Sequence, residues 1–128
     1  MTELTELERA VLAKLLEGRH RLLEQLREQL PNCRVTRREL TGVGFYAYLD
    51  CGDAPRANHA NLRFGDVVAQ IGGMADGAGF VLYVEHGRLY MLEGYGYSDP
   101  WPNRIAGYAL QYNGGDRRDW GALTKALE

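Results

Sequence analysis

Acidic side chains within apolar segments are the first candidates for chemistry in this sequence. Glu93 lies in an apolar, aromatic stretch that spans residues 79–97. If this stretch forms a hairpin with its turn at His86-Gly87, Glu93 pairs with Phe80 and shares its face. A lone carboxylate on that face is costly to bury, and carboxyl groups in such surroundings often serve as general acids. The alternative is that Gly94 or a bulge turns Glu93 outward, or that it bonds a neighbouring tyrosine or backbone group.

The remaining polar candidates give no catalytic arrangement. Asp66 follows Phe64-Gly65 at the start of a predicted strand, a position typical of turn capping. The three histidines, His20, His59 and His86, share no ligand spacing, and no Cys or Ser stands beside them as a nucleophile. We therefore assign no catalytic residue and expect no metal and no cofactor. Enzymatic activity is left open, and a non-enzymatic role is favoured.

Aromatic residues are the third set of candidates. The eight tyrosines lie on or beside predicted strands, and alternation places some of them on the sheet face away from the helix. An exposed tyrosine-rich patch is typical of protein interfaces. The ligand- or partner-binding candidates are Glu93, Asp66, Tyr46, Tyr48, Tyr83, Tyr90, Tyr95 and Trp101. The alternative is that the C-terminal helix or a second subunit covers this face, because a sheet that is apolar on both faces must be covered.

Several elements must position these residues. The 79–97 hairpin is apolar on both sides and should lie in the centre of a sheet. Residues 3–30 predict a helix, because leucines recur at steps of three, four and seven, and Gly18 marks a bend or a break into two helices. The charged segment from Cys33 to Leu40 favours an edge strand. Asp119 can cap a short terminal helix.

These elements predict an α+β fold in a single domain. A long N-terminal helix packs on a curved, mostly antiparallel sheet of five or six strands, and a short C-terminal helix follows. Residues 1–31 form the helical lid, 32–113 the sheet, and 114–128 the tail with its helix. With 128 residues, the chain is long enough for one core.

The two cysteines, Cys33 and Cys51, lie opposite each other if their segments form a hairpin centred on Gly42. They form either a cross-strand disulfide or two reduced, half-buried thiols. We favour reduced thiols, because disulfides between neighbouring strands are often strained and the cytosol is reducing.

Composition excludes several classes of function. The net charge of −2 gives no basic field for nucleic acid. The acidic N-terminal segment is wrong for a secretory signal, and no apolar run approaches the roughly 20 residues that span a bilayer. We expect a cytoplasmic protein with no membrane or nucleic-acid partner.

Four segments carry a family resemblance: GVGFYAYL, LRFGDVVAQIGG, GAGFVLYVEHGRLYMLEGYGY and DPWP. With them, residues 42–112 resemble a family of small bacterial α+β proteins to which no activity is assigned. The resemblance implies a compact α+β domain and singles out Asp66, Glu93 and Trp101. Small acidic α+β proteins of this type also look like toxin-neutralising immunity proteins, an analogy of fold only.

Three hypotheses for function follow. The first is a protein-binding or self-associating module that uses the tyrosines and the Trp101 corner. The second is a small-molecule binder or enzyme with a pocket between helix and sheet that contains Glu93. The third is an immunity-type protein, for which a net charge of −2 is a small acidic excess.

Overall fold

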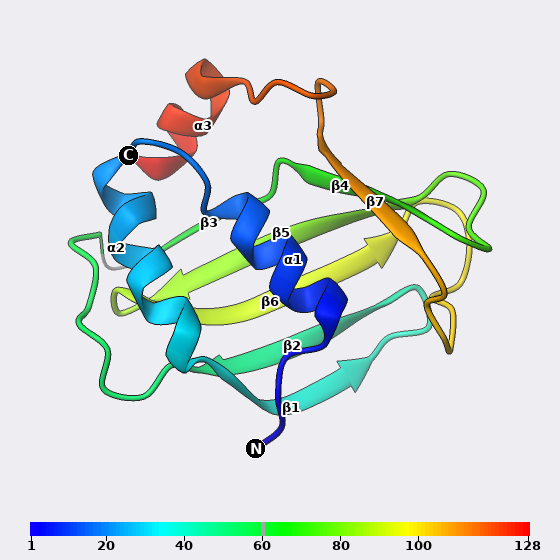
Figure 1. Ribbon diagram of the computed structural model, residues 1–128, viewed down its shortest axis with the longest axis horizontal. Coiled ribbons are helices and arrows are strands. Elements are labelled where there is room, and N and C mark those ends of the chain that lie inside the picture. Colours follow the sequence, from blue (N-terminus) through cyan, green and yellow to red (C-terminus); the bar gives the residue numbers. More distant parts are fainter. Residues whose placement is uncertain (60) are drawn as a thin grey trace.

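The computed structural model describes residues 1–59 and 61–128, and within them three α-helices lie on one side of a single β-sheet (Figure 1). The helices are α1 (Glu6–Leu15), α2 (Arg21–Gln29) and α3 (Trp120–Leu127). A short 3-10 helix, η1 (Leu30–Asn32), follows α2.

The expected single long helix over residues 3–30 is wrong, because the segment forms two helices that are separated around Gly18. Gly18 has a φ of 117°, a conformation that glycine adopts at little cost. A side chain at this position would also collide with the indole of Trp120 in α3. The start of α1 is as expected, since Thr5 and Glu8 form a capping box.

Seven strands form one sheet in the described residues, one more than the upper number expected, and every strand pair is antiparallel. The order is β1-β2-β6-β5-β4-β7, with β3 paired to β5. The edge position of the first strand and the central position of the 79–97 hairpin are therefore confirmed. The strands are β1 (Arg34–Leu40), β2 (Gly44–Asp50), β3 (Leu62–Phe64), β4 (Val67–Ile71), β5 (Ala78–Glu85), β6 (Arg88–Gly96) and β7 (Tyr108–Tyr112).

The central hairpin turns where the sequence predicts, but its register differs beyond the first two pairs. His86 and Gly87 have φ values of 52° and 73°, as a tight hairpin turn requires. Next to the turn, Tyr90 is an extra residue that shifts the pairing by one position. The predicted pairing of Phe80 with Glu93 is therefore wrong. Because a one-residue shift moves side chains to the other face, Glu93 lies on the face opposite to Phe80.

The hydrophobic core lies between the helices and one face of the sheet. Fully buried leucines of α1 and α2 meet Phe80 and Leu82 of β5 there. Leu123 and Leu127 of α3 belong to the same core, so the C-terminal helix packs beside the other two helices. The suggestion that this helix covers the second face is wrong. Within residues 1–59 and 61–128, no helix covers that face (Figure 1).

A disulfide joins Cys33 to Cys51. The two residues are opposite each other, as expected, since the adjacent Arg34 and Asp50 pair across β1 and β2. Both cysteines are buried. The expectation of two reduced, half-buried thiols is therefore wrong. It rested on a reducing cytosol, whereas the pairing of β1 with β2 brings the two cysteines close enough to bond.

Candidate functional site

The open face of the sheet, meaning the face away from the three helices, gathers the five tyrosines that the sequence singled out. Cross-strand partners share a face. The register pairs Tyr46 with Glu93, Tyr48 and Tyr83 with Met91, and Tyr83 with Arg63. The ring of Tyr90 lies edge-on to Tyr48, with 6.0 Å between their centroids. The open face includes Arg37, Glu39, Tyr46, Tyr48, Arg63, Val81, Tyr83, Tyr90, Met91, Glu93 and Tyr95.

Acidic side chains hold the tyrosine hydroxyls on the open face. Tyr83 donates to Glu93 Oε1 at 2.9 Å, and Tyr48 donates to Glu39 Oε2 at 3.2 Å. Burial raises the pKa of Tyr83, and the hydrogen bond to Glu93 raises it further, so the phenol stays protonated to a higher pH than a free tyrosine does. The guanidinium of Arg37 lies 4.3 Å from the centre of the Tyr48 ring. Glu93 is thus a half-buried, hydrogen-bonded carboxylate on an aromatic surface.

Asp66 lies apart from the tyrosines and holds a buried cation. Arg118 is 9% exposed, and it donates through Nε and Nη2 to the two oxygens of Asp66 at 2.6 Å and 2.9 Å. The same guanidinium donates to the carbonyls of Leu15 and Glu17 at the end of α1. Asp66 also lines a cleft of about 430 Å³ beside α3. Because Arg118 bonds both of its oxygens, Asp66 ties α1 to the start of β4.

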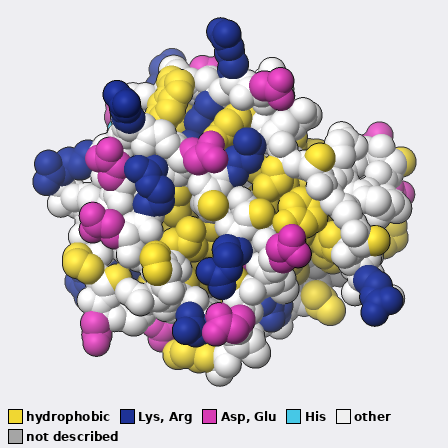
Figure 2. Space-filling view, in the orientation of Figure 1, with side chains coloured by type: hydrophobic (Ala, Val, Ile, Leu, Met, Phe, Trp, Pro, Cys, Tyr) yellow, Lys and Arg dark blue, Asp and Glu magenta, His cyan; other side chains and the backbone are white. Residues whose placement is uncertain are grey.

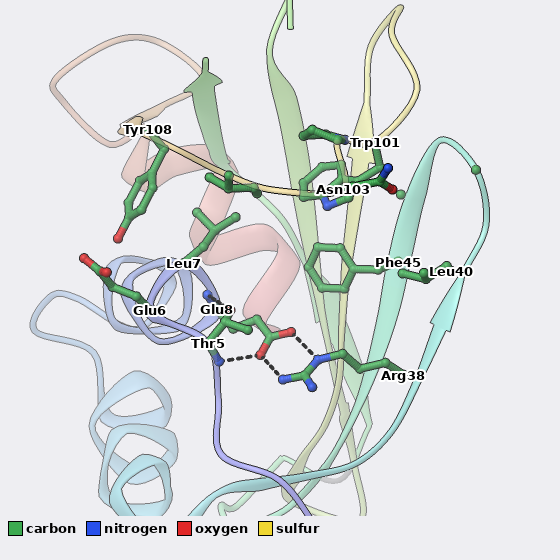
Figure 3. A pocket seen from close by; sticks show the side chains of 14 residues that line it. Thr5, Glu6, Leu7, Glu8, Arg38, Leu40, Phe45, Trp101, Asn103 and Tyr108 are labelled. Atoms are coloured by element: carbon green, nitrogen blue, oxygen red, sulfur yellow. Dashed lines mark hydrogen bonds and ion pairs between the residues drawn. The ribbon is translucent and has the colours of Figure 1, made fainter. Parts of the chain in front are cut away.

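A larger cleft lies on the helix side of the sheet. It has a volume of about 570 Å³ and is bounded by the first turn of α1, the β1–β2 hairpin and residues 101–108 (Figure 3). In the space-filling view, hydrophobic side chains gather between charged ones where these elements meet (Figure 2). Trp101 lines this cleft, so it shares no surface with the open-face tyrosines. Glu93 is not among the lining residues, so the expected helix–sheet pocket exists without its expected anchor.

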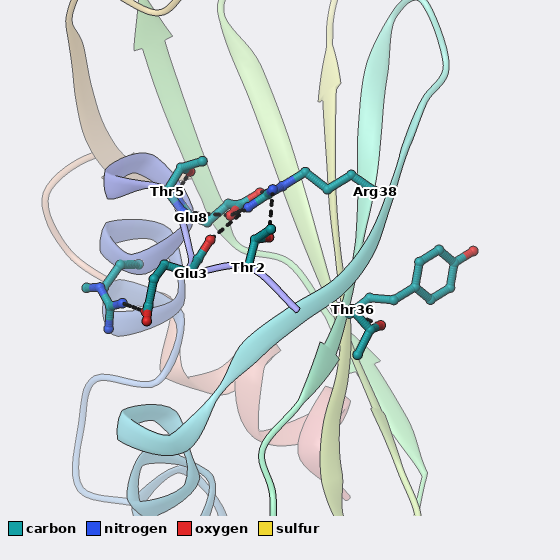
Figure 4. Close-up of polar contacts among 8 residues, drawn as sticks. Thr2, Glu3, Thr5, Glu8, Thr36 and Arg38 are labelled. Atoms are coloured by element: carbon teal, nitrogen blue, oxygen red, sulfur yellow. Dashed lines mark hydrogen bonds and ion pairs between the residues drawn. The ribbon is translucent and has the colours of Figure 1, made fainter.

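An ion pair that the sequence analysis missed lines the same cleft. Glu8 is 4% exposed and accepts from Nε and Nη2 of Arg38 at 2.9 Å and 2.7 Å, while Oε1 also accepts from the backbone of Thr5 (Figure 4). The other contacts of Arg38 are Thr2 Oγ1 and the Glu3 carbonyl. The sequence places Arg38 on a predicted edge strand, but nothing in it indicates that Glu8 is the partner of Arg38.

Among residues 1–59 and 61–128, no group of three or more His, Cys, Asp or Glu side chains is placed to hold a metal ion. In the same residues, no helix has both the length and the apolar character needed to cross a membrane. No family model, curated protein or solved structure matches this chain, so the resemblance of residues 42–112 to a bacterial family stays a prediction.

Proposed function

We propose that the chain is a self-associating protein-binding module in which the open faces of two copies meet. One observation carries this proposal: five tyrosines, with Val81 and Met91, lie on a sheet face that no helix covers in the described part of the chain. A sheet that carries apolar groups on both faces is normally covered on both. Tyrosine and methionine are also enriched in the cores of protein interfaces.

The charges on the open face favour a second copy as the occupant. Around the tyrosines the face carries two bases, Arg37 and Arg63, and two acids, Glu39 and Glu93, so these charges sum to zero. In a two-fold interface each contact occurs twice, so every base can lie near an acid of the other copy without net repulsion. An immunity-type role, in which an acidic surface mimics a substrate, gains no support from this neutral face.

Sedimentation velocity over a range of concentrations tests the proposal. We expect a species of twice the 14.4 kDa chain mass that forms with increasing concentration. Tyr90→Lys should shift the equilibrium to monomer, because Tyr90 is 38% exposed on the open face and lies outside the hydrophobic core. Leu40→Lys is the matched control, since Leu40 is 80% exposed and lines the cleft on the other side.

Dimerisation that Tyr90→Lys weakens and Leu40→Lys leaves intact would support the proposal. A wild-type chain that stays monomeric at all concentrations would overturn it. Equal weakening by both variants would also overturn it, because the dimer would then not depend on the open face.

A further inference from the structure

The cleft on the helix side has the size and the prebuilt walls of a small-molecule site. Its volume of about 570 Å³ lies within the range of small-molecule pockets, roughly 300–1,000 Å³. Trp101 forms one wall, and its ring packs edge-on against Phe45 and Phe80 at centroid distances of 5.1 Å and 6.4 Å. The backbone N–H of Trp101 donates to the Gly42 carbonyl at 2.8 Å. Pro100 and Pro102 flank Trp101 and restrict its backbone.

Charge in the cleft favours a cation over an anion. Its lining includes two carboxylates, Glu6 and Glu8, and one guanidinium, Arg38, which gives one net negative charge. Arg38 directs two N–H groups to Glu8 and two more to Thr2 and Glu3, so it has little capacity left for an anionic ligand. Glu8 is likewise satisfied by Arg38 and by the backbone of its capping box.

With Glu8 and Arg38 paired to one another, the net negative charge of the cleft comes from Glu6. Its carboxylate is exposed and forms no ion pair with Lys or Arg in residues 1–59 and 61–128. The side chains of Glu6 and Tyr108 point toward one another at one end of the cleft, and Trp101 and Phe45 lie at the other (Figure 3). The cleft therefore offers an anionic end and an aromatic end.

We propose that this cleft binds a small organic cation with an aromatic body, a free arylalkylamine. The ammonium group lies by the Glu6 carboxylate and the Tyr108 hydroxyl, and the ring lies against Trp101 and Phe45. The aromatic walls favour such a ligand because they bury its ring, and the Glu6 carboxylate attracts its ammonium group. The cleft and the open face are on opposite sides of the sheet, so this site is independent of self-association.

Isothermal titration calorimetry with phenethylamine and phenylpropionate tests the site. The two probes share the ring and the two-carbon chain and differ in the sign of the terminal charge. We expect the amine to bind about tenfold more tightly than the carboxylate. The ammonium group of the amine forms an exposed ion pair with Glu6, whereas the carboxylate is repelled by the same group. Equal affinities, tighter binding of the carboxylate, or no heat from the amine at millimolar concentration would overturn the proposal.

Glu6→Gln tests the anionic end, because it removes the charge and keeps the length of the side chain. It should weaken phenethylamine binding by up to about fivefold, the most that one exposed ion pair supplies. Glu24→Gln is the matched control, because Glu24 is also an exposed acid in the first turn of a helix, α2, and does not line the cleft. Unchanged binding in Glu6→Gln, or equal loss in both variants, would overturn the assignment of Glu6. Thermal midpoints of both variants close to that of the wild-type chain would show that both remain folded.

Discussion

Replacing Asp66 with alanine should destabilise the fold strongly, because it leaves the guanidinium of Arg118 buried without its anion. Arg118 makes four hydrogen bonds, two to Asp66 and one each to the carbonyls of Leu15 and Glu17. Breaking a buried ion pair from one side costs about 3–5 kcal/mol. The side chain of Asp66 is 22% exposed, so in the variant water can reach Arg118 and replace part of the lost interaction. We therefore use the lower end of this range of free energies and expect a loss of about 3 kcal/mol in the free energy of unfolding.

Urea unfolding followed by circular dichroism measures this loss. Asp116→Ala is the matched control, because Asp116 is exposed and should change the free energy of unfolding by less than about 0.5 kcal/mol. The double variant Asp66→Ala, Arg118→Met should recover part of the stability, since it removes the unpaired charge and keeps most of the volume. A free energy of unfolding for Asp66→Ala equal to that of the Asp116 control would refute the reasoning. Asp66 would then be available for binding rather than required for packing.

The disulfide, the buried Gln29 and Tyr112 give three further expectations. Reducing Cys33–Cys51 should lower the free energy of unfolding by about 3 kcal/mol, since the bond restricts the unfolded chain across a sequence separation of 18; an unchanged urea midpoint with reductant would contradict this. Gln29→Leu should cost about 2 kcal/mol in the same assay, because Gln29 accepts from the backbone of Leu89 and its loss leaves a buried N–H unpaired. Burial and the hydrogen bond to Glu17 raise the pKa of Tyr112 to about 12, above the value of about 10 for an unfolded chain. The stability present below pH 10 should therefore fall as pH rises toward 12, and an ultraviolet titration that shows all tyrosines ionising near 10 would contradict it.

Local patterns predicted the elements well, because their signals lie within a few residues. The leucine spacing predicted helical structure in residues 3–30, although as one long helix rather than two, and Thr5 with Glu8 located the start of α1. His86-Gly87 located the turn of the central hairpin. The sequence could not decide whether the helix bends or breaks at Gly18. The indole that leaves no room for a side chain there belongs to Trp120, about a hundred positions away.

The register and the ion pairs could not be predicted from the same patterns. Both registers of the central hairpin pair mostly apolar residues and set Glu93 opposite an apolar residue, so nothing local marks Tyr90 as the extra residue. That single shift decided the face of Glu93. The partners of Glu8 and Asp66 are 30 and 52 residues away, and only the folded topology brings them together.

The identity of the surface that meets the second copy is the most direct test of the proposed function. Isotope-filtered NOE spectra of a mixed dimer, with one copy labelled and the other unlabelled, report only contacts between copies. The proposed self-association predicts contacts between the rings of Tyr46, Tyr48, Tyr83 and Tyr90 of one copy and the open face of the other. Contacts that arise only from the helices or the cleft, or no contacts between copies at all, would contradict it.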